Sequence, residues 1–221
     1  MNNVIIVAGG KGLRMGGDFP KQFIAVDSIP ILIRTIDSFY NFDNRIKIIV
    51  VLPESYIEHW QRMCKGYGFS IKHDVVEGGE TRFDSVKNGL SLVEEGWVAV
   101  HDAVRPFASK QLIGECFHQA VIHQAVIPVT EVVDSMREIS GEEESRIVDR
   151  ANFRLVQTPQ VFEAELLKRA YEQPYNNSFT DDASVVEAYG HRVHLVQGER
   201  NNIKITTPFD LTLADVIAKI K

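Results

Sequence analysis

Short apolar runs alternate along the chain with segments whose apolar residues recur every three or four positions. The runs have the length and composition of strands, and they lie at 4–7, 46–52, 70–76, 97–100, 125–129 and 194–197. The intervening segments have the spacing of amphipathic helices, for example 54–65, 109–124, 163–171 and 181–189. Strands that alternate with helices predict an α/β fold, with a Rossmann-like, doubly wound and mostly parallel sheet covered by helices on both faces.

Polar residues with capping chemistry mark where two late helices begin. Thr180 is expected to cap the helix at 181–189. Thr207 is expected to cap a last helix that has Pro208 at its first position. Asp210 then occupies the acidic position of a capping box.

The alternation breaks between 131 and 154. Two β-rich segments there lie on either side of a polar tip at 140–145, and no helix follows to cover them. This pattern is typical of a hairpin, and we expect it to project as a β-arm from a single domain that spans 1–221. Because an isolated hairpin is only marginally stable in water, the arm is expected to pack against a second copy of the chain and form a homodimer.

The first strand ends at a glycine-rich loop, Ala8-Gly-Gly-Lys-Gly-Leu-Arg-Met. Glycines let the backbone approach a ligand closely and turn its N–H groups toward an anion. Arg14 and Lys21 add two cations beside those amides. Such a site suits a nucleoside triphosphate and the charge that develops on a phosphorus under attack, whereas a solvated surface loop is the alternative for the segment taken alone.

Two better-known phosphate-binding motifs do not fit this loop. The Walker motif needs a lysine followed by serine or threonine, but Lys11 is followed by Gly12. The dinucleotide fingerprint needs its third glycine where Met15 stands, so a nicotinamide-dependent oxidoreductase is the least favoured function. With Pro20 and Lys21 behind it, the loop instead resembles the opening signature of nucleotidyltransferases that join an NTP to a sugar or polyol phosphate.

A second loop with ligand-binding character lies at 77–81. Gly78 and Gly79 precede a helix N-terminus, where free amides and the helix dipole favour an anion or a polar ligand edge. The alternative is that Thr81 is only a helix cap and Arg82 only a solvated charge.

A charged cluster follows the strand at 97–100. Ligands of open parallel sheets bind outside the carboxyl ends of the strands, and this strand delivers His101-Asp-Ala-Val-Arg-Pro there. Asp102 is expected to hold ribose hydroxyls or to approach a magnesium ion, and Arg105 to hold substrate hydroxyls or phosphate. His101 is expected to be structural, because transfer by an ionised phosphate needs no protein base.

Composition and charge narrow the class of protein. The formal net charge is −6, which argues against binding of nucleic acid by the field of the whole protein. Cys64 and Cys116 have no metal-ligand spacing and are expected to be free thiols. No apolar run reaches membrane-spanning length and the first strand leaves no room for a signal peptide, so the expected compartment is the cytoplasm.

Together these segments resemble the 2-C-methyl-D-erythritol 4-phosphate cytidylyltransferase family, which makes CDP-methylerythritol in the non-mevalonate isoprenoid pathway. The resemblance implies the fold type of the nucleotide-diphospho-sugar transferases and the transfer of a cytidylyl group from CTP, with release of pyrophosphate. It extends from end to end and rests on these motifs: Ala8-Gly-Gly-Lys-Gly-Leu-Arg-Met, Pro20-Lys-Gln, Gly78-Gly-Glu-Thr-Arg-Phe-Asp-Ser-Val, His101-Asp-Ala-Val-Arg-Pro, Asp134-Ser-Met, Val148-Asp-Arg, Gln157-Thr-Pro-Gln, Thr180-Asp-Asp-Ala-Ser and Asn202-Ile-Lys-Ile-Thr.

The resemblance also implies a role for each matching residue. Arg14 and Lys21 would stabilise the transition state at the α-phosphorus of CTP, and Arg150 and Lys204 would position the attacking phosphate. Because the arm crosses a dimer in this family, Ser135 and Arg150 would serve the neighbouring subunit's site. The residues implied to bind CTP are Ala8, Gly9, Gly10, Gly12, Gly79, Arg82, Ser85, Asp102 and Ala103. Those implied to bind the polyol phosphate are Arg105, Ser135, Thr158 and Thr180.

The implied cofactor is Mg²⁺, held mainly by the phosphates of CTP. Ribitol 5-phosphate is the alternative polyol, because ribitol-5-phosphate cytidylyltransferases share three of the motifs. Val148-Asp-Arg and Thr81-Arg-x-x-Ser-Val are closer to the methylerythritol enzymes. A non-catalytic nucleotide sensor on the same fold is a further alternative, which the retention of Arg14 and Lys21 disfavours.

Overall fold

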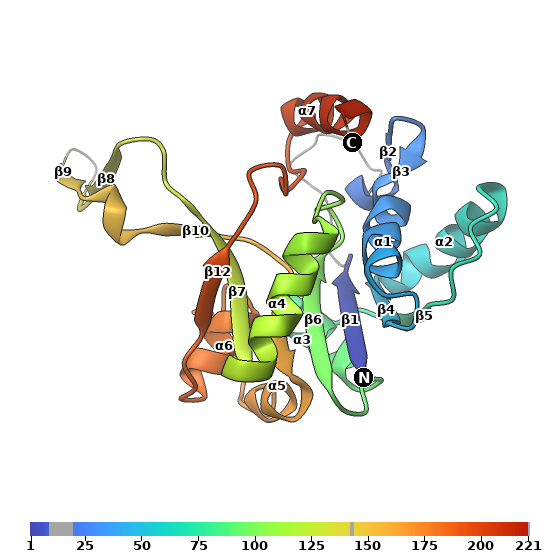
Figure 1. Ribbon diagram of the computed structural model, residues 1–221, viewed down its shortest axis with the longest axis horizontal. Helices are drawn as coiled ribbons and strands as arrows, with labels where there is room; N and C mark the ends of the chain where they lie inside the picture. The colour runs from blue at the N-terminus through green and yellow to red at the C-terminus, as the bar shows by residue number, and fades with distance from the viewer. Residues whose placement is uncertain (9–19, 142–143, 221) are drawn as a thin grey trace.

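The computed structural model describes residues 1–8, 20–141 and 144–220 of the 221-residue chain. Within these residues the main sheet has eight strands in the order β10-β7-β11-β6-β1-β4-β5, with β12 also paired to β7 (Figure 1). The strands are β1 (Asn2–Val7), β4 (Lys47–Leu52), β5 (Asp74–Glu77), β6 (Trp97–Asp102), β7 (Ala125–Glu131), β10 (Arg154–Val156), β11 (Gln160–Glu163) and β12 (His194–Gln197).

The sheet is mostly parallel, which confirms the prediction. β1 pairs in parallel with β4 and β6, β4 pairs in parallel with β5, and β7 pairs in parallel with β12. β10 and β11 run the other way, and β11 lies between β6 and β7. The sequence predicts that 155–162 returns the chain to the sheet, and the structure divides this stretch into the two strands β10 and β11.

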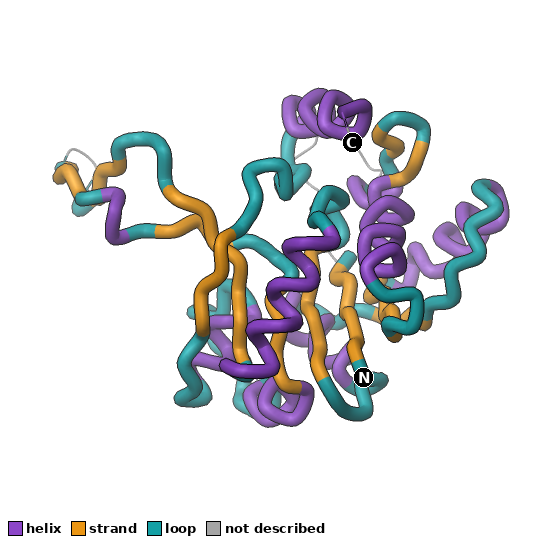
Figure 2. Tube along the Cα trace, viewed as in Figure 1, coloured by secondary structure: helices purple, strands orange, loops and turns teal. Residues whose placement is uncertain are grey.

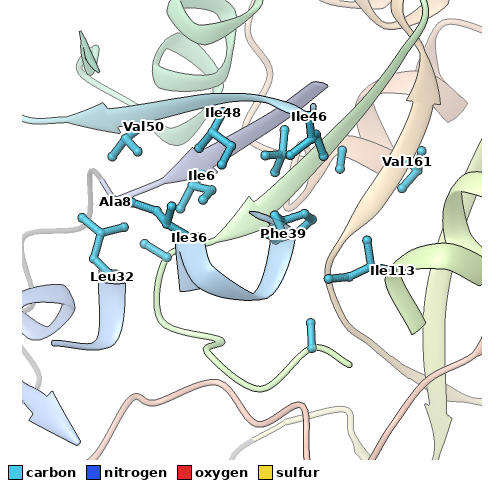
Figure 3. Close-up of a cluster of buried hydrophobic side chains, with 14 of the residues drawn as sticks. Ile6, Ala8, Leu32, Ile36, Phe39, Ile46, Ile48, Val50, Ile113 and Val161 are labelled. Carbon is cyan, nitrogen blue, oxygen red and sulfur yellow. The ribbon is translucent and has the colours of Figure 1, made fainter. Parts of the chain in front are cut away.

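Helices cover both faces of the sheet. α1 (Ile31–Phe42), α2 (Glu54–Gly66) and α4 (Lys110–His123) pack on one face, and α3 (Arg82–Leu90), α5 (Ala164–Ala170) and α6 (Asp182–Ala188) pack on the other. Side chains of β1 alternate between the two cores, with Val4 and Ile6 in the first and Ile5 in the second. Figure 3 shows the first core, in which Ile6 lies among side chains from α1 and β4. The strand is therefore buried on both faces, as its composition predicts.

Several element boundaries differ from the prediction, and two of the differences change an assignment. β5 begins at Asp74 rather than at Ser70, so the first half of the predicted strand is a loop. Asp181, and not Thr180, caps α6, because the Asp181 carboxylate accepts from the backbone N–H of Ser184 (2.9 Å) and the Ser184 hydroxyl accepts from the Asp181 N–H (3.2 Å). This reciprocal pair is a capping box, and it leaves Thr180 outside the helix.

The predicted arm is present as a hairpin that projects from the body. β8 (Met136–Ile139) and β9 (Ser145–Val148) pair with each other in a separate two-stranded sheet. Figures 1 and 2 show this hairpin at the far left, beyond the end of the main sheet. Ile139 and Ile147 are 71% and 69% exposed, so the hairpin has apolar surface that this single chain does not bury.

The last helix, α7 (Pro208–Ile220), lies apart from the two main helical layers, at the top of Figure 1. It packs through Ala214 and Ile217 on the short hairpin of β2 (Ala25–Val26) and β3 (Ile29–Pro30). Thr207 and Asp210 form the predicted capping interaction, with the Thr207 N–H donating to the Asp210 carboxylate (2.7 Å). No helix in the described residues is long and apolar enough to span a membrane.

Candidate functional site

The candidate site lies where β6 ends. The loop after β6 and the segment that leads from β12 to α7 meet at this end of the sheet, as the loop tracings of Figure 2 show. Asp102, the last residue of β6, is contacted from both of these segments. The parallel sheet therefore presents a carboxylate at the edge where ligands of such folds bind.

Two cations share one oxygen of Asp102. Arg105 Nε lies 3.0 Å and Lys204 Nζ 3.1 Å from Oδ2 of Asp102. Arg105 also donates through Nη1 to the backbone oxygen of Asn202 (2.9 Å), which ties the two segments together. Burial raises the pKa of Asp102, but the charges of Lys204, Arg82 and Arg105 outweigh it and hold the pKa well below its usual range. The carboxylate is ionised across the physiological range.

His101 is a buried, neutral support of this cluster. Its Nε2–H donates to the backbone oxygen of Arg105 (2.9 Å), so its Nδ1 accepts from the hydroxyl of Thr158 (3.0 Å). The Thr158 oxygen in turn accepts from the N–H of Asp102 (3.1 Å). Burial lowers the pKa of His101 to about 4, so the ring fixes the loop rather than acting as a base at neutral pH.

The loop before α3 is shaped by Gly79 and Ser85. The Ser85 hydroxyl donates to the Thr81 backbone oxygen (2.9 Å) and accepts from the Gly79 N–H (3.1 Å). A Cβ at Gly79 would lie 2.2 Å from the Cβ of Asp84, so no other residue fits without moving the loop. Thr81 and Asp84 form a capping box at the start of α3, so the helix cap that the sequence offered only as an alternative interpretation is present.

Arg82 is not a solvated charge. Its Nη1 and Nη2 donate to the two carboxylate oxygens of Asp182 at 3.1 and 2.6 Å. The Arg82 side chain is 32% exposed, whereas that of Asp182 is fully buried. The pair links the loop before α3 to the start of α6.

Lys21 contacts the segment that carries Lys204. It lies in a short 3-10 helix, η2 (Lys21–Phe23), and its Nζ donates to the backbone oxygen of Thr206 (2.5 Å). The neighbouring Gln22 donates to the backbone oxygen of Ala8 (2.7 Å), at the end of the first strand. These contacts place a buried ammonium between the β1 end of the sheet and the segment that carries Lys204.

Comparisons with known proteins place the chain. Residues 2–219 match the family model of 2-C-methyl-D-erythritol 4-phosphate cytidylyltransferase. The chain belongs to this family. It is 57% identical over 216 residues to the Phocaeicola vulgatus protein of that name, covering 97% of this chain and 98% of the relative. It is 55% identical over 214 residues to the Bacteroides fragilis protein of the same name, covering 96% and 97%.

Solved structures of the family share the fold. The crystal structure of the Thermus thermophilus enzyme superposes with a TM-score of 0.81 at 32% identity, covering 99% of this chain and 100% of that one. The Anaerococcus prevotii structure, titled 4-diphosphocytidyl-2C-methyl-D-erythritol synthase, gives a TM-score of 0.83 at 28% identity, covering 99% and 98%. The chain is therefore a nucleotidyltransferase, and the family name favours methylerythritol phosphate over ribitol phosphate as the substrate.

The structure brings together only part of the residue set expected for this family. Asp102, Arg105, Thr158 and Lys204 form one hydrogen-bonded cluster, with Arg82 close enough to influence the Asp102 charge. The backbone N–H groups of two expected CTP contacts are used within the sheet, since Ala8 donates to Val51 (2.9 Å) and Ala103 donates to Val7 (3.1 Å). The expected contacts Gly9, Gly10, Gly12 and Arg14 lie outside the described residues.

The other expected residues lie outside the cluster in this single chain. Ser135 and Arg150 belong to the segments flanking the projecting hairpin, and Arg150 donates to the backbone oxygen of Val133. Thr180 is exposed beside the start of α6. Their roles remain predictions that a second chain or a bound ligand would test.

Sequence reasoning missed the buried polar residues that hold the site in place. Asn202 donates to the Thr158 backbone oxygen (2.8 Å), and Gln157 donates to the Glu199 backbone oxygen (2.8 Å) and accepts from its N–H (3.1 Å). Both residues stand inside motifs that carry the family resemblance, so the signal was present. Their types alone did not distinguish a buried clamp from a ligand contact.

Proposed function

We propose that this chain transfers the cytidylyl group of CTP to 2-C-methyl-D-erythritol 4-phosphate, releasing pyrophosphate and forming CDP-methylerythritol for isoprenoid precursor synthesis. The observation that carries the proposal is the cluster at the end of β6, where Lys204 and Arg105 share the Asp102 carboxylate. An accessible cation beside an ionised acceptor suits a ligand that has both a phosphate and several hydroxyl groups. The name of the matched family supports a cytidine nucleotide and methylerythritol phosphate as the two substrates.

The chemistry is a direct in-line displacement. A phosphate oxygen of the polyol phosphate attacks the α-phosphorus of CTP, a new P–O bond forms, and the bond to the bridging oxygen breaks as pyrophosphate leaves with its electron pair. No protein base is required, because the attacking phosphate is already ionised, and the buried His101 is neutral. The catalytic contribution is the positioning of two polyanions and the neutralisation of their repulsion.

The roles of individual residues follow the charges. We infer that Lys21 and Arg14 stabilise the charge that grows around the α-phosphorus, and that Lys204 and Arg150 hold the attacking phosphate. Asp102 and Arg105 then form hydrogen bonds with hydroxyl groups of the ribose or the polyol. The loop fixed by Gly79 and Ser85 faces the nucleotide, and Thr158 keeps the Asp102 backbone in register.

A divalent ion, Mg²⁺, would be held mainly by the phosphates of CTP. The described residues contain no group of three or more His, Cys, Asp or Glu side chains able to hold a metal, and Asp102 is already paired with two cations. These residues fit an ion that would be held by the phosphates of the nucleotide rather than by protein carboxylates. When bound, the ion assists the departure of pyrophosphate.

We also infer that the chain works as a homodimer through the arm at 131–154. Val133, Ile139 and Ile147 are each more than half exposed in the single chain and would be covered by a partner. Ser135 and Arg150 would then reach the site of the neighbouring subunit. The cytoplasmic location expected from the sequence stays a prediction.

The deciding experiment measures pyrophosphate release by the purified chain with CTP, Mg²⁺ and either methylerythritol 4-phosphate or ribitol 5-phosphate. Release that depends on the methylerythritol compound supports the proposal. Release with ribitol 5-phosphate alone would move the chain to the alternative enzyme, and CTP binding without release from either polyol would make it a nucleotide sensor.

A further inference from the structure

Asp182 is a fully buried carboxylate close to the site. Its two oxygens accept from Arg82 at 3.1 and 2.6 Å, and Oδ1 also accepts from the phenol of Tyr171 at 2.6 Å. Burial raises the pKa of Tyr171, so the phenol stays protonated and can donate. A buried charge is costly unless it is paired and hydrogen-bonded, and here both oxygens are satisfied.

The position of Asp182 is set by the sheet. Gln160, the first residue of β11, donates to the Asp181 carboxylate (2.8 Å) and accepts from the N–H of Ala183 (2.9 Å). Both neighbours of Asp182 are thus held by one buried side chain, and β11 is the strand that pairs with β6 on the side opposite β1. Asp182, at the start of α6, is therefore held in place by β11, the strand next to β6, which carries Asp102.

Arg82 is paired with one acid and influences the pKa of another. It pairs directly with Asp182, and its charge also acts on Asp102, whose direct partners are Lys204 and Arg105. Removing the charge of Asp182 would leave Asp102 as the neighbouring acid for Arg82, in competition with Lys204. A bidentate guanidinium is a stronger partner for a carboxylate than a single ammonium.

We propose that Asp182, supported by Tyr171, is a positioning residue for cytidylyl transfer: it holds Arg82 away from Asp102, so that Lys204 stays where it receives the phosphate of the polyol substrate. This inference rests on the proposed function, because it assigns the phosphate to Lys204. Asp182 itself is buried and touches no substrate.

The test compares Asp182→Asn with wild type in the pyrophosphate-release assay, varying each substrate in turn. We expect kcat/KM for methylerythritol phosphate to fall at least about tenfold, the size expected when a charge-assisted contact is lost. In an Arg82→Leu background the competing cation is absent, so Asp182→Asn should change kcat/KM by less than about twofold. A loss that simply adds to that of Arg82→Leu, or an Asp182→Asn enzyme equal to wild type, would overturn the proposal.

Two further variants separate positioning from folding. Tyr171→Phe keeps the charge of Asp182 and removes one hydrogen bond, so it should lower the same kcat/KM at least about twofold. If Asp182→Asn does not fold, this variant decides, and unchanged kinetics would reject the proposal. Glu163→Gln is the matched control, because Glu163 caps α5 at the opposite end of β11 (2.6 Å to the Leu166 N–H) and should cost stability while kinetic constants stay unchanged.

The wild-type assay distinguishes a failure of the role proposed for Asp182 from a failure of the proposed function. A wild-type chain that releases pyrophosphate with CTP and methylerythritol phosphate, while Asp182→Asn behaves identically, would reject only the role of Asp182. A wild-type chain that releases none with this substrate would reject the proposed function itself.

Discussion

Lys204 and Asp102 form an ion pair in which Nζ lies 3.1 Å from Oδ2, with the lysine side chain 46% exposed and the aspartate side chain only 12% exposed. A ligand can therefore reach the cation, whereas the acid that anchors it is nearly enclosed. Because Arg105 holds the same oxygen at 3.0 Å, Asp102 does not lose its only cation when Lys204 turns to a phosphate.

The first prediction concerns Lys204. Replacing it by alanine should raise KM for the polyol phosphate and lower kcat/KM at least about tenfold, because one charged contact to the attacking phosphate is lost. The measurement is steady-state pyrophosphate release with CTP saturating. Lys219→Ala is the control, since Lys219 is exposed in the last turn of α7. Equal kinetics for the two variants would remove Lys204 from the site.

The second prediction concerns Lys21. Its replacement by alanine should lower kcat at least about a hundredfold, the size of the loss of one preorganised electrostatic donor. Single-turnover measurement of the chemical step checks this, because it excludes slow product release. Near-normal turnover would contradict the assigned role, and a lower melting temperature alone would indicate that the contact with Thr206 is only structural.

The third prediction concerns Gly79. In Gly79→Ala the new Cβ would meet the Cβ of Asp84 at 2.2 Å, so the loop must shift. We expect a loss of about 1–3 kcal/mol in the free energy of unfolding and a raised KM for CTP. Gly66→Ala is the control, because a Cβ there meets nothing within 4 Å, and its effect on both quantities should be small. An unchanged KM for CTP in Gly79→Ala would show that the loop does not face the nucleotide.

The fourth prediction is a pH dependence of stability. Burial lowers the pKa of His101 to about 4 from the ordinary value of 6.5, so the unfolded chain binds this proton more readily than the folded one. The free energy of unfolding therefore keeps its full value above pH 6.5, and the contribution of the neutral His101 is lost as the pH falls from 6.5 to about 4. It amounts to about 3 kcal/mol. Urea unfolding of wild type and His101→Gln across this range should show a shallower pH dependence in the variant, and identical slopes would contradict it.

The fifth prediction concerns the arm. Ile147→Asp places a charge on an apolar residue that is 69% exposed in the single chain, and it should shift the chain from dimer to monomer. Analytical ultracentrifugation over a range of concentrations measures the shift. Val121→Asp on α4, at a residue of 61% exposure outside the arm, should leave the assembly unchanged. A wild-type chain that sediments as a monomer would reject the dimer.

The sequence predicts those strands and helices whose conformation is determined by the pattern of apolar and polar residues within the segment itself. The doubly buried run at Val4–Val7 and the hairpin with its polar tip are recognised because local residues alone determine them. The sequence predicts that 155–162 returns to the sheet, but it does not separate β10 from β11, because so short a stretch carries no periodicity. Only the space between β6 and β7 makes the second half a central strand.

The residues of the site likewise fall into those that local motifs reveal and those that only the fold reveals. Asp102, Arg105 and Lys204 were named from motifs, and the structure adds that the three meet at one carboxylate oxygen. Asp182 was hidden because Asp181 and Asp182 stand side by side, and only their burial shows that one caps a helix and the other holds Arg82. The roles of Ser135 and Arg150 depend on a neighbouring chain, which no single sequence positions.

Because β6 has hydrogen-bonded neighbours on both sides, the backbone that ends in Asp102 has little freedom to adapt to a new ligand. Attempts to redesign this protein for a different sugar alcohol should therefore vary the exposed Thr180 region and the arm, and keep the strand intact. In such a library, active clones are expected to retain residues 97–102 while the outer segments diverge.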